Sequence, residues 1–475
     1  MSNLFKRFFI ILLFAVLGLC LFSCGNSSSG GSKKDKIGDF ETPPFLGKKF
    51  LGKVVCKNCH SSTVKEWENT AHASAFSLIP ATDPVCQRCH TTGFDTSVSN
   101  GGFDENNSKK LKNVQCESCH QAAANFGPHG PNGKEKVFKS IKFNRTLLAL
   151  NSEVCGFCHT KTVAGSFSKG QFDQWENSSH SKALENIKGN PGTNQACVKC
   201  HTVESIYVKD VELASAKFGV ECTACHDPHS VKNIFQLLSF GSVTLENKTT
   251  VNADIAAVCM GCHTDLIEDA DVAAESGAAP RYNQSEMFSG SGGIQYGETL
   301  ENSFHTTDAF KVAGNDKNEK CITCHMVKTP DEGKPGHNTI GEHSFAMRDK
   351  DDNINIGACQ QCHTTLTTFD RKARGDYDGN GKTEGIQTEL AGLLAILKAA
   401  ITASGSVTFS SDSFGRDEFI FSAGATSKEK KAAFNWLFVN DDKSKGIHNT
   451  AYAVQLLQKS YKDLTGTDVP GATIR

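Results

Sequence analysis

Helical periodicity of apolar residues is clearest in the last quarter of the chain. Six aliphatic residues there recur at intervals of three and four, which places them on one face of a helix: Ile386, Leu390, Leu393, Leu394, Leu397 and Ile401. Residues 428–439 and 450–464 predict two further helices with apolar positions at Phe434, Trp436, Phe438, Val454, Leu457 and Tyr461. We therefore predict a helical region over residues 371–475, whose helices are also candidates for contacts with a second copy of the chain.

Between residues 50 and 370 the sequence predicts only short helical segments and extensive irregular structure. Hydrophobic residues make up 38% of the 475 residues, below the usual share of globular proteins, and the mean hydropathy is −0.34. A chain of this composition needs another source of apolar core. The sequence therefore predicts a mainly α-helical protein with much irregular structure, in which something other than side chains fills the interior.

A pentapeptide, C-x-x-C-H, occurs nine times and supplies that source. It uses 18 of the 20 cysteines, and the nine copies begin at Cys56, Cys86, Cys116, Cys155, Cys197, Cys222, Cys259, Cys321 and Cys359. This is the attachment sequence of c-type haem, in which both thiols form thioethers to the porphyrin and the adjacent histidine binds the iron. Zinc sites or redox-active dithiols also use C-x-x-C, but they do not require a histidine after every pair. We predict nine covalently bound haems.

The predicted thioether and proximal ligands follow directly from the nine motifs. The remaining thioether cysteines are Cys59, Cys89, Cys119, Cys158, Cys200, Cys225, Cys262, Cys324 and Cys362, and the proximal histidines are His60, His90, His120, His159, His201, His226, His263, His325 and His363.

The motifs are grouped in threes. The first cysteines of the groups, Cys56, Cys155 and Cys259, lie 99 and 104 residues apart, and such a regular repeat indicates an architecture of modules. We predict three three-haem modules, at residues 50–150 (haems 1–3), 151–250 (haems 4–6) and 251–370 (haems 7–9), followed by the C-terminal helical region.

Eight histidines outside the motifs are candidates for the second, distal iron ligand. They are His72, His129, His180, His229, His305, His337, His343 and His448. His72 and His180 each lie five residues after a tryptophan, on a predicted short helix. His129 and His229 each follow a proline, which fixes the local backbone of a loop. In the third module His343 is favoured by its Ser-Phe context, whereas His337 has the alternative of a polar loop residue and His448 that of a capped surface loop.

The histidine count is one short. Seventeen histidines minus nine proximal ligands leave eight for nine distal positions, so at least one haem lacks a second histidine from its own chain. That iron is open, takes a methionine such as Met287, Met326 or Met347, or takes a ligand from a neighbouring subunit. If it is open, Arg281, Tyr282 and Tyr296 are the nearby polar residues of first interest.

Residues 376–387 resemble the first half of an EF-hand calcium loop. Oxygen-bearing side chains occur at loop positions 1, 3, 5 and 9, and glycine at position 6. The candidate calcium ligands are Asp376, Asp378, Asn380, Lys382 (through its backbone carbonyl) and Glu384. Position 12 is Gln387 in place of the bidentate glutamate, so a plain Asx/Gly turn is the equal alternative.

The N-terminus has the pattern of a lipoprotein signal. Lys6 and Arg7 precede an apolar run from Phe8 to Phe22, and Ser23 precedes Cys24 as the small residue of a lipobox. We predict a signal peptide over residues 1–23, lipidation of Cys24, and a flexible Gly/Ser tether within residues 24–49. An ordinary cleaved leader or an uncleaved anchor is the alternative. Export also suits c-type haem attachment, which takes place outside the cytoplasmic membrane.

The formal net charge is −2, which does not favour a nucleic-acid partner. Haem propionates make the mature protein more acidic, which favours basic redox partners or cationic metal species.

The nine motifs, Trp67 with His72, Trp175 with His180, and His343-Ser-Phe345 resemble the multihaem c-type cytochromes. Among these, the chain is most similar to the superfamily of tetrahaem cytochromes, hydroxylamine oxidoreductase and pentahaem nitrite reductase. The lipobox and the haem number resemble outer-surface lipoprotein cytochromes of metal-reducing bacteria. The resemblance implies closely stacked haems that form a continuous electron path.

The sequence thus predicts an outer-membrane lipoprotein, on the periplasmic or cell-surface side, that carries electrons in anaerobic or extracellular respiration. Its partners would be redox proteins and extracellular metal acceptors. The alternative is a reductase of nitrite, hydroxylamine or a sulfur oxyanion at the haem without a second histidine, so an enzymatic role stays open at this point. Relatives that reduce nitrite generally carry a lysine in the active motif, and no such motif occurs here, which favours the carrier.

Overall fold

The computed structural model describes residues 50–80, 82–97, 99–106, 109–120, 149–161, 170–190, 193–233, 235–310 and 319–475. All of them belong to one compact unit, Phe45–Arg475. The predicted signal peptide (1–23), Cys24 with its tether (24–49) and His129 lie outside the described residues. No helix among the described residues is long and apolar enough to cross a membrane.

The haem motifs form single helical turns, as the chemistry requires. Residues i and i+3 are neighbours on a helix, so a helical turn places both thiols of a motif on one side. The helical elements that overlap the nine motifs are α2 (Lys53–Lys57), α4 (Pro84–His90), α6 (Cys116–His120), α8 (Ser152–His159), α12 (Val198–His201), η7 (Cys222–Ala224), α14 (Ala257–Met260), α17 (Cys321–His325) and α18 (Gly357–Gln360).

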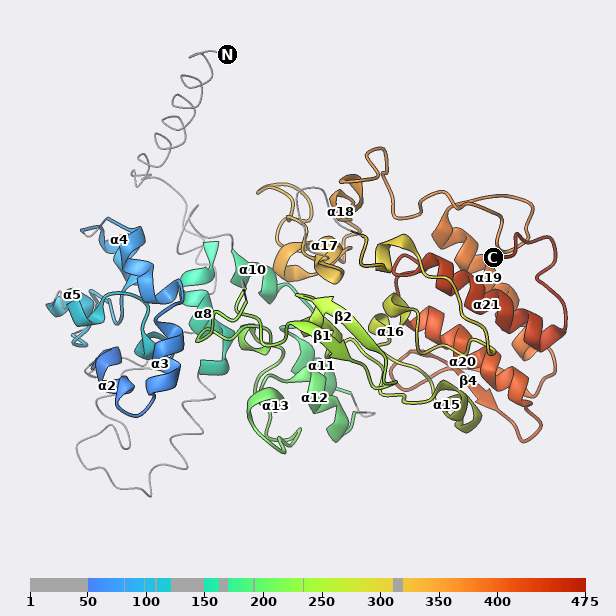
Figure 1. The fold of residues 1–475 in the computed structure, drawn as a ribbon, viewed down its shortest axis with the longest axis horizontal. Coiled ribbons are helices and arrows are strands. Elements are labelled where there is room, and N and C mark those ends of the chain that lie inside the picture. The colour runs from blue at the N-terminus through green and yellow to red at the C-terminus, as the bar shows by residue number, and fades with distance from the viewer. Residues whose placement is uncertain are drawn as a thin grey trace, which may run out of the picture. The chain divides into compact units, whose positions relative to one another are not determined.

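Short elements connect these motifs (Figure 1). They are α3 (Ser61–Trp67), η1 (His72–Leu78), α5 (Phe103–Asn106), η2 (Lys109–Leu111), α10 (Gln171–Glu176), α11 (Ala183–Lys188), η6 (Gln195–Cys197), α13 (Glu204–Tyr207), α15 (Ala270–Ser276), α16 (Gln284–Ser289), η8 (Phe304–Thr306) and η9 (Glu342–Ser344). No helix before residue 370 in the described part exceeds eight residues. The predicted fold class, mainly helical with extensive irregular structure, is confirmed.

The helices that carry the two Trp-His patterns end earlier than predicted. The helix α3 stops at Trp67, because the hydroxyl of Thr70 and the backbone N–H of the same residue both donate to the Trp67 carbonyl. His72 then begins the separate 3-10 helix η1. The imidazole is therefore presented by a turn that follows the helix.

Two β-hairpins were not predicted. Strands β1 (Gly241–Thr244) and β2 (Thr250–Asp254) pair antiparallel, and so do β3 (Val407–Ser411) and β4 (Asp417–Phe421). Each is an isolated two-stranded ribbon that covers a helix. The second hairpin packs the rings of Phe409 and Phe419 edge-on against Trp436, with ring centroids 5.3–5.4 Å apart.

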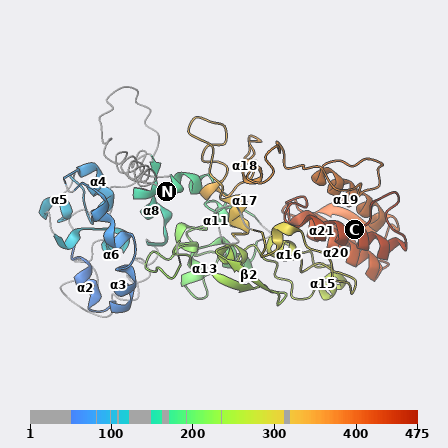
Figure 2. The same ribbon diagram turned by 45° about the horizontal axis from the view of Figure 1, so that its top comes forward.

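The predicted C-terminal helices are present as α19 (Ile386–Thr402), α20 (Ser427–Asp441) and α21 (Thr450–Thr465) (Figures 1 and 2). Thr426 and Glu429 form a capping box at the start of α20, and Asn449 caps α21. The apolar face of α19 is fully buried at Leu390, Leu393 and Leu397. The three helices pack on one another and form the largest side-chain core of the described chain.

The segment that joins motifs 7 and 8 also packs on these helices. The backbone N–H of Ile294 donates to the buried Asn435 side chain on α20 at 2.8 Å, and the same side chain donates to the Ile294 carbonyl at 2.9 Å. Ala273 and Ala274 of α15 contact Phe434 on the same helix. The C-terminal core therefore includes residues from the region predicted as the third module.

Candidate haem sites

Within the motifs, the backbone turns each histidine toward the two cysteines. The backbone N–H of the motif histidine donates to the carbonyl of the first cysteine, for example from His60 to Cys56 at 2.9 Å and from His363 to Cys359 at 2.8 Å. The motif closes one helical turn in this way. Both thiols and the imidazole are then ready to hold one porphyrin, two at its edge and one at its iron.

Six motif histidines face a histidine from outside the motifs. The paired rings, with their centroid separations, are His72 and His159 (6.2 Å), His120 and His229 (5.9 Å), His180 and His263 (6.0 Å), His226 and His343 (6.3 Å), His305 and His363 (6.1 Å), and His325 and His448 (6.1 Å). Every one of these pairs joins one motif histidine to one candidate distal histidine. Random contacts between histidine rings would not pair a motif histidine with a non-motif histidine in all six cases.

The separation of about 6 Å fits one metal ion between two imidazoles. Metal–nitrogen bonds to histidine are about 2 Å long. With each ring centroid about 1.1 Å beyond its nitrogen, two ligands on opposite sides of an iron have centroids about 6 Å apart. The donor set of the motifs and these six pairs fit haem with two imidazole ligands.

Hydrogen bonds at Nδ1 leave the other ring nitrogen for the iron. Nδ1 of His226 lies 2.8 Å from the Phe235 carbonyl, and that of His325 lies 2.8 Å from the Phe345 carbonyl. A carbonyl only accepts, so Nδ1 carries the proton and Nε2 carries the lone pair.

Two distal candidates donate to carboxylates instead. Nδ1 of His448 lies 2.6 Å from Oδ1 of Asp442, whose side chain is 1% exposed. Nδ1 of His229 lies 3.0 Å from Oδ1 of Asp227, in a more exposed setting. Burial disfavours the charged imidazole of His448, but the Asp442 carboxylate outweighs it and raises the pKa of this histidine. Such carboxylate–histidine pairs raise the basicity of a metal ligand.

Burial keeps other distal candidates neutral. It lowers the pKa of His72, His180 and His343 to about 4, and the neighbouring histidines add to this shift. A neutral imidazole has the free lone pair that iron binding needs.

The cysteines show which motifs are neighbours. Thiols within hydrogen-bonding reach of each other pair Cys56 with Cys116, Cys89 with Cys158, Cys155 with Cys222, Cys200 with Cys262, and Cys259 with Cys321. Three further pairs of thiols lie near enough for the charge of one to affect the pKa of the other: Cys119 with Cys155, Cys225 with Cys262, and Cys324 with Cys359. In motif numbers, these neighbouring thiols give the order 1–3–4–6–7–8–9, with motif 2 beside motif 4 and motif 5 beside motif 7.

Buried carboxylates hold the first and third motifs of a module together. Glu117, inside motif 3, accepts hydrogen bonds from the backbone N–H groups of Leu51 and Gly52, just before motif 1. Glu221, just before motif 6, accepts one from Ser152, just before motif 4. Sequence reasoning missed this repeated contact, although glutamate recurs next to the first cysteine of both third motifs.

Motif 5 is different from the six pairs. Opposite His201 lies the ring of Tyr282, with centroids 6.2 Å apart and an interplanar angle of 72°. The other two polar residues singled out from the sequence face elsewhere. Arg281 lies beside Asp412 and Asp441, and the hydroxyl of Tyr296 donates to Ser460 in the C-terminal core.

Two other histidines have their Nδ1 close to a backbone carbonyl. Nδ1 of His90 lies 2.6 Å from the Ala75 carbonyl, and Nδ1 of His337 lies 2.6 Å from the Pro330 carbonyl. His337 is thus tied into its own loop, whereas His343, the other candidate between motifs 8 and 9, faces the motif histidine His226.

The candidate calcium loop gathers three carboxylates. Oxygens of Asp376, Asp378 and Glu389 lie within 4.8 Å of one another. Glu389 was not among the predicted ligands because it lies two residues beyond loop position 12. Among the predicted ligands, Asn380 donates to Glu384 at 2.9 Å, and the backbone N–H of Lys382 donates to the Asn380 side chain.

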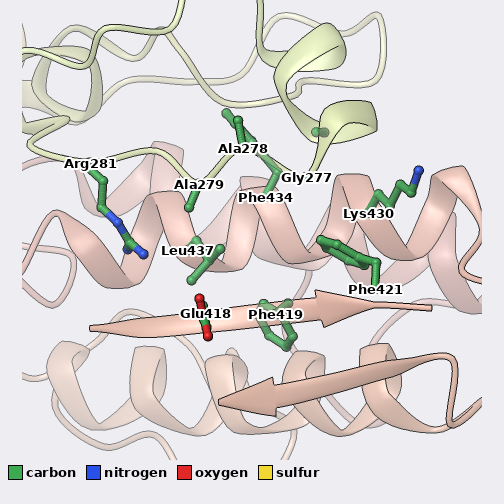
Figure 3. A pocket seen from close by; sticks show the side chains of 11 residues that line it. Gly277, Ala278, Ala279, Arg281, Glu418, Phe419, Phe421, Lys430, Phe434 and Leu437 are labelled. Carbon is green, nitrogen blue, oxygen red and sulfur yellow. The ribbon is translucent and has the colours of Figure 1, made fainter. Parts of the chain in front are cut away.

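A small pocket of about 70 Å³ lies beside the C-terminal helices (Figure 3). Its walls come from the segment after α15, from β4 and from α20, and Arg281, Glu418 and Lys430 are its charged residues. None of its lining residues is a haem-motif cysteine or histidine.

Comparisons with known proteins agree with this chemistry. The family described as cytochrome c554 and c-prime matches residues 55–121 and 154–227, and the doubled CXXCH motif family matches residues 215–268. No curated protein matches the chain significantly.

Two solved structures share the fold. The outer cell wall cytochrome OcwA has a TM-score of 0.55 and 18% identity over 88% of this chain and 100% of its own. The undecahaem cytochrome from the S-layer of Carboxydothermus ferrireducens has a TM-score of 0.50 and 16% identity over 88% of this chain and 70% of its own. The motifs, the family matches and the fold together identify the chain as a multihaem c-type cytochrome.

Proposed function

We propose that this chain is a nonahaem electron carrier in which at least six irons have two histidine ligands. The six histidine pairs are the observation that carries this proposal. An iron with two imidazole ligands stays six-coordinate in both oxidation states, so little rearrangement accompanies electron transfer. Two imidazoles also keep the potential below that of a histidine–methionine haem.

The cysteine contacts support a linear electron path. If each motif holds a haem, neighbouring attachment points bring porphyrin edges together along the order 1–3–4–6–7–8–9. Electrons then enter at one end and leave at the other, with haems 2 and 5 as side branches.

Most of the distal ligands link parts of the chain that are distant in sequence. His72, for example, serves motif 4, and His180 serves motif 7. Each iron therefore joins two segments, and haem binding stabilises the fold of a chain with little side-chain core before residue 370. This explains how so little regular secondary structure suffices.

We place the mature protein on the cell surface, attached through lipidated Cys24. The N-terminal sequence pattern supports the anchor, and the outer-cell-wall and S-layer locations named for the two structural neighbours favour a surface location. Its partners are then a membrane-side redox protein and an extracellular acceptor such as an oxidised metal species. Calcium is proposed at Asp376, Asp378 and Glu389, where it would offset three close negative charges.

Electron paramagnetic resonance of the oxidised protein tests the proposal, together with a spectroelectrochemical titration. We expect low-spin ferric signals for at least six haems and a broad reduction over several overlapping low potentials. Predominantly high-spin signals in a fully haem-loaded sample would contradict the assignment of two histidines per iron.

A further inference from the structure

The short helix α10 contacts three separate parts of the haem-binding region through consecutive side chains. Asp173 accepts a hydrogen bond from the Thr160 hydroxyl at 2.6 Å, directly after motif 4. The indole N–H of Trp175 donates to the Val220 carbonyl at 2.8 Å, two residues before motif 6. Between these two contacts, Gln174 reaches a third segment that is distant in sequence.

That third segment is the η9 turn, which carries a candidate iron ligand. The side-chain N–H of Gln174 donates to the carboxylate of Glu342, and its amide oxygen accepts from the backbone N–H of His343 at 3.2 Å. Gln174 is 1% exposed, so both hydrogen bonds are shielded from water. His343 faces His226 of motif 6 with ring centroids 6.3 Å apart. A single buried glutamine therefore holds the backbone of this distal candidate.

The η9 turn depends on contacts from outside. Glu342 has a φ of 42° and Phe345 a φ of 57°, both in the left-handed region that residues with side chains seldom adopt. Strained backbone of this kind persists only where surrounding contacts hold it. The backbone N–H of Glu342 donates to the Val327 carbonyl at 3.0 Å, and Gln174 holds the turn from its other side. Loss of the Gln174 contacts should let the turn relax.

The same turn also touches ligands of the next two motifs in the order given by neighbouring thiols. The ring of Phe345 lies 4.9 Å from the ring of His180, the candidate distal ligand of motif 7. The Phe345 carbonyl lies 2.8 Å from Nδ1 of His325, the motif histidine of motif 8. A shift of the turn therefore acts on motif 6 first, and on motifs 7 and 8 through Phe345.

On its other side, α10 packs directly on motif 4. A Cβ atom added at Gly156, inside this motif, would lie only 2.6 Å from the ring of Phe172. Phe172, Asp173, Gln174 and Trp175 thus connect motif 4 to the segment before motif 6 and to the distal side of motif 6. The thiols of these two motifs are themselves neighbours, as the contact of Cys155 with Cys222 indicates.

We propose that α10 sets the relative placement of the haems of motifs 4 and 6, with Gln174 as the positioning residue for the distal ligand His343. Trp175 fixes the chain that enters motif 6, and Gln174 fixes the ligand on the opposite side of the iron. The step between these two haems lies within the proposed electron path. This inference rests on the proposed electron carrier and adds the residue that keeps this step in its geometry.

An exchange of side chains tests the role of Gln174. Gln174→Glu places a second carboxylate against Glu342, and the repulsion between them should break the contact. Adding Glu342→Gln should restore it, because the new amide donates to the new carboxylate, whose other oxygen still accepts from the His343 N–H. Glu342→Gln alone leaves two amides that can still form a hydrogen bond, so it should have little effect.

The measurements are electron paramagnetic resonance and spectroelectrochemistry of the full mature protein. Gln174→Glu should change the low-spin g-values of at least the motif 6 haem and of at most three haems, because the angle between the two imidazole planes sets those values. Where His343 dissociates, a new high-spin signal should appear and the haem potential should rise. The double variant should return both readouts to wild type. Glu176→Gln removes an exposed carboxylate from the same helix and is the matched control, which should change neither.

A second variant covers the case in which Gln174→Glu does not mature. Gln174→Ala removes the same two hydrogen bonds without adding a charge. It should shift the g-values in the same haems, and Glu342→Gln should not restore them, because no partner for the new amide is left at position 174.

Two results would overturn the proposal. One is wild-type spectra and potentials in the Gln174 variants at nine haems per chain, and the other is a defect of Gln174→Glu that Glu342→Gln does not relieve. Mass spectrometry and the wild-type spectrum keep this test separate from the electron-carrier proposal. Missing haems or a predominantly high-spin wild type would refute the carrier, whereas unresponsive Gln174 variants would refute only the role of α10.

Discussion

The carboxylate behind His448 offers a sharp test of the proposed axial ligands. Oδ1 of Asp442 lies 2.6 Å from Nδ1 of His448, and its side chain is 1% exposed. If His448 binds the iron of motif 8, the carboxylate stabilises the more positive ferric state and lowers the haem potential. Asp442→Asn removes this charge and keeps the size of the side chain.

The expected shift follows from the distance. An iron bound at Nε2 lies about 6–7 Å from the carboxylate oxygen, and at an effective dielectric constant of about 20 one charge at that distance contributes about 2–3 kcal/mol. This corresponds to roughly 100 mV for one electron. The potential of the motif 8 haem should therefore rise by about that amount.

The assay is a spectroelectrochemical titration of wild type and variant, with one haem in nine expected to shift. Asp227→Asn is the matched control, because Asp227 contacts His229 at 3.0 Å but is 31% exposed. Solvent screening should make its shift clearly smaller. Unchanged midpoints in Asp442→Asn, or a downward shift, at full haem content would refute the assignment of His448 as a ligand.

Three other perturbations have defined outcomes. Burial raises the pKa of Glu221 above 4.5, so the folded chain binds this proton more tightly than the unfolded chain. The stability that this proton contributes is lost as the pH rises through the raised pKa. Glu221→Gln should therefore make the melting temperature fall less with pH above pH 4.5, and an unchanged pH dependence would contradict this. Asn435→Ala removes three buried hydrogen bonds in the C-terminal core and should cost about 3 kcal/mol in urea unfolding at unchanged haem content, whereas a cost below about 1 kcal/mol would contradict the role of this side chain. Chelation with EDTA should lower the melting temperature of the C-terminal region in wild type but not in Glu389→Gln, and equal melting of wild type with and without EDTA would exclude calcium there.

The sequence predicted elements whose signal is local. The spacing of Ile386, Leu390 and Leu397 encodes one face of a helix, and the helix α19 buries that face. The motif turns are equally local, because five residues define each one. The β3–β4 hairpin was missed because its strands are short and its burial depends on Trp436 in the next helix, α20.

The pairing of histidines that are distant in the chain could not be predicted from the sequence. His72 and His159 are separated by 86 intervening residues, and nothing in either neighbourhood specifies the other. Glu389 escaped notice because the loop does not follow the EF-hand register. The shortfall of one distal histidine was predictable by counting, but which motif histidine each candidate faces emerged only from the fold.

The central claim is that nine haems are bound covalently through 18 cysteines. Intact mass spectrometry of mature protein from a host with a haem-attachment system tests it most directly, combined with peptide mapping of the nine motifs. The proposed function predicts nine haem masses, with one at each C-x-x-C-H peptide. A polypeptide without added porphyrin mass, or with several motifs left unmodified, would contradict it.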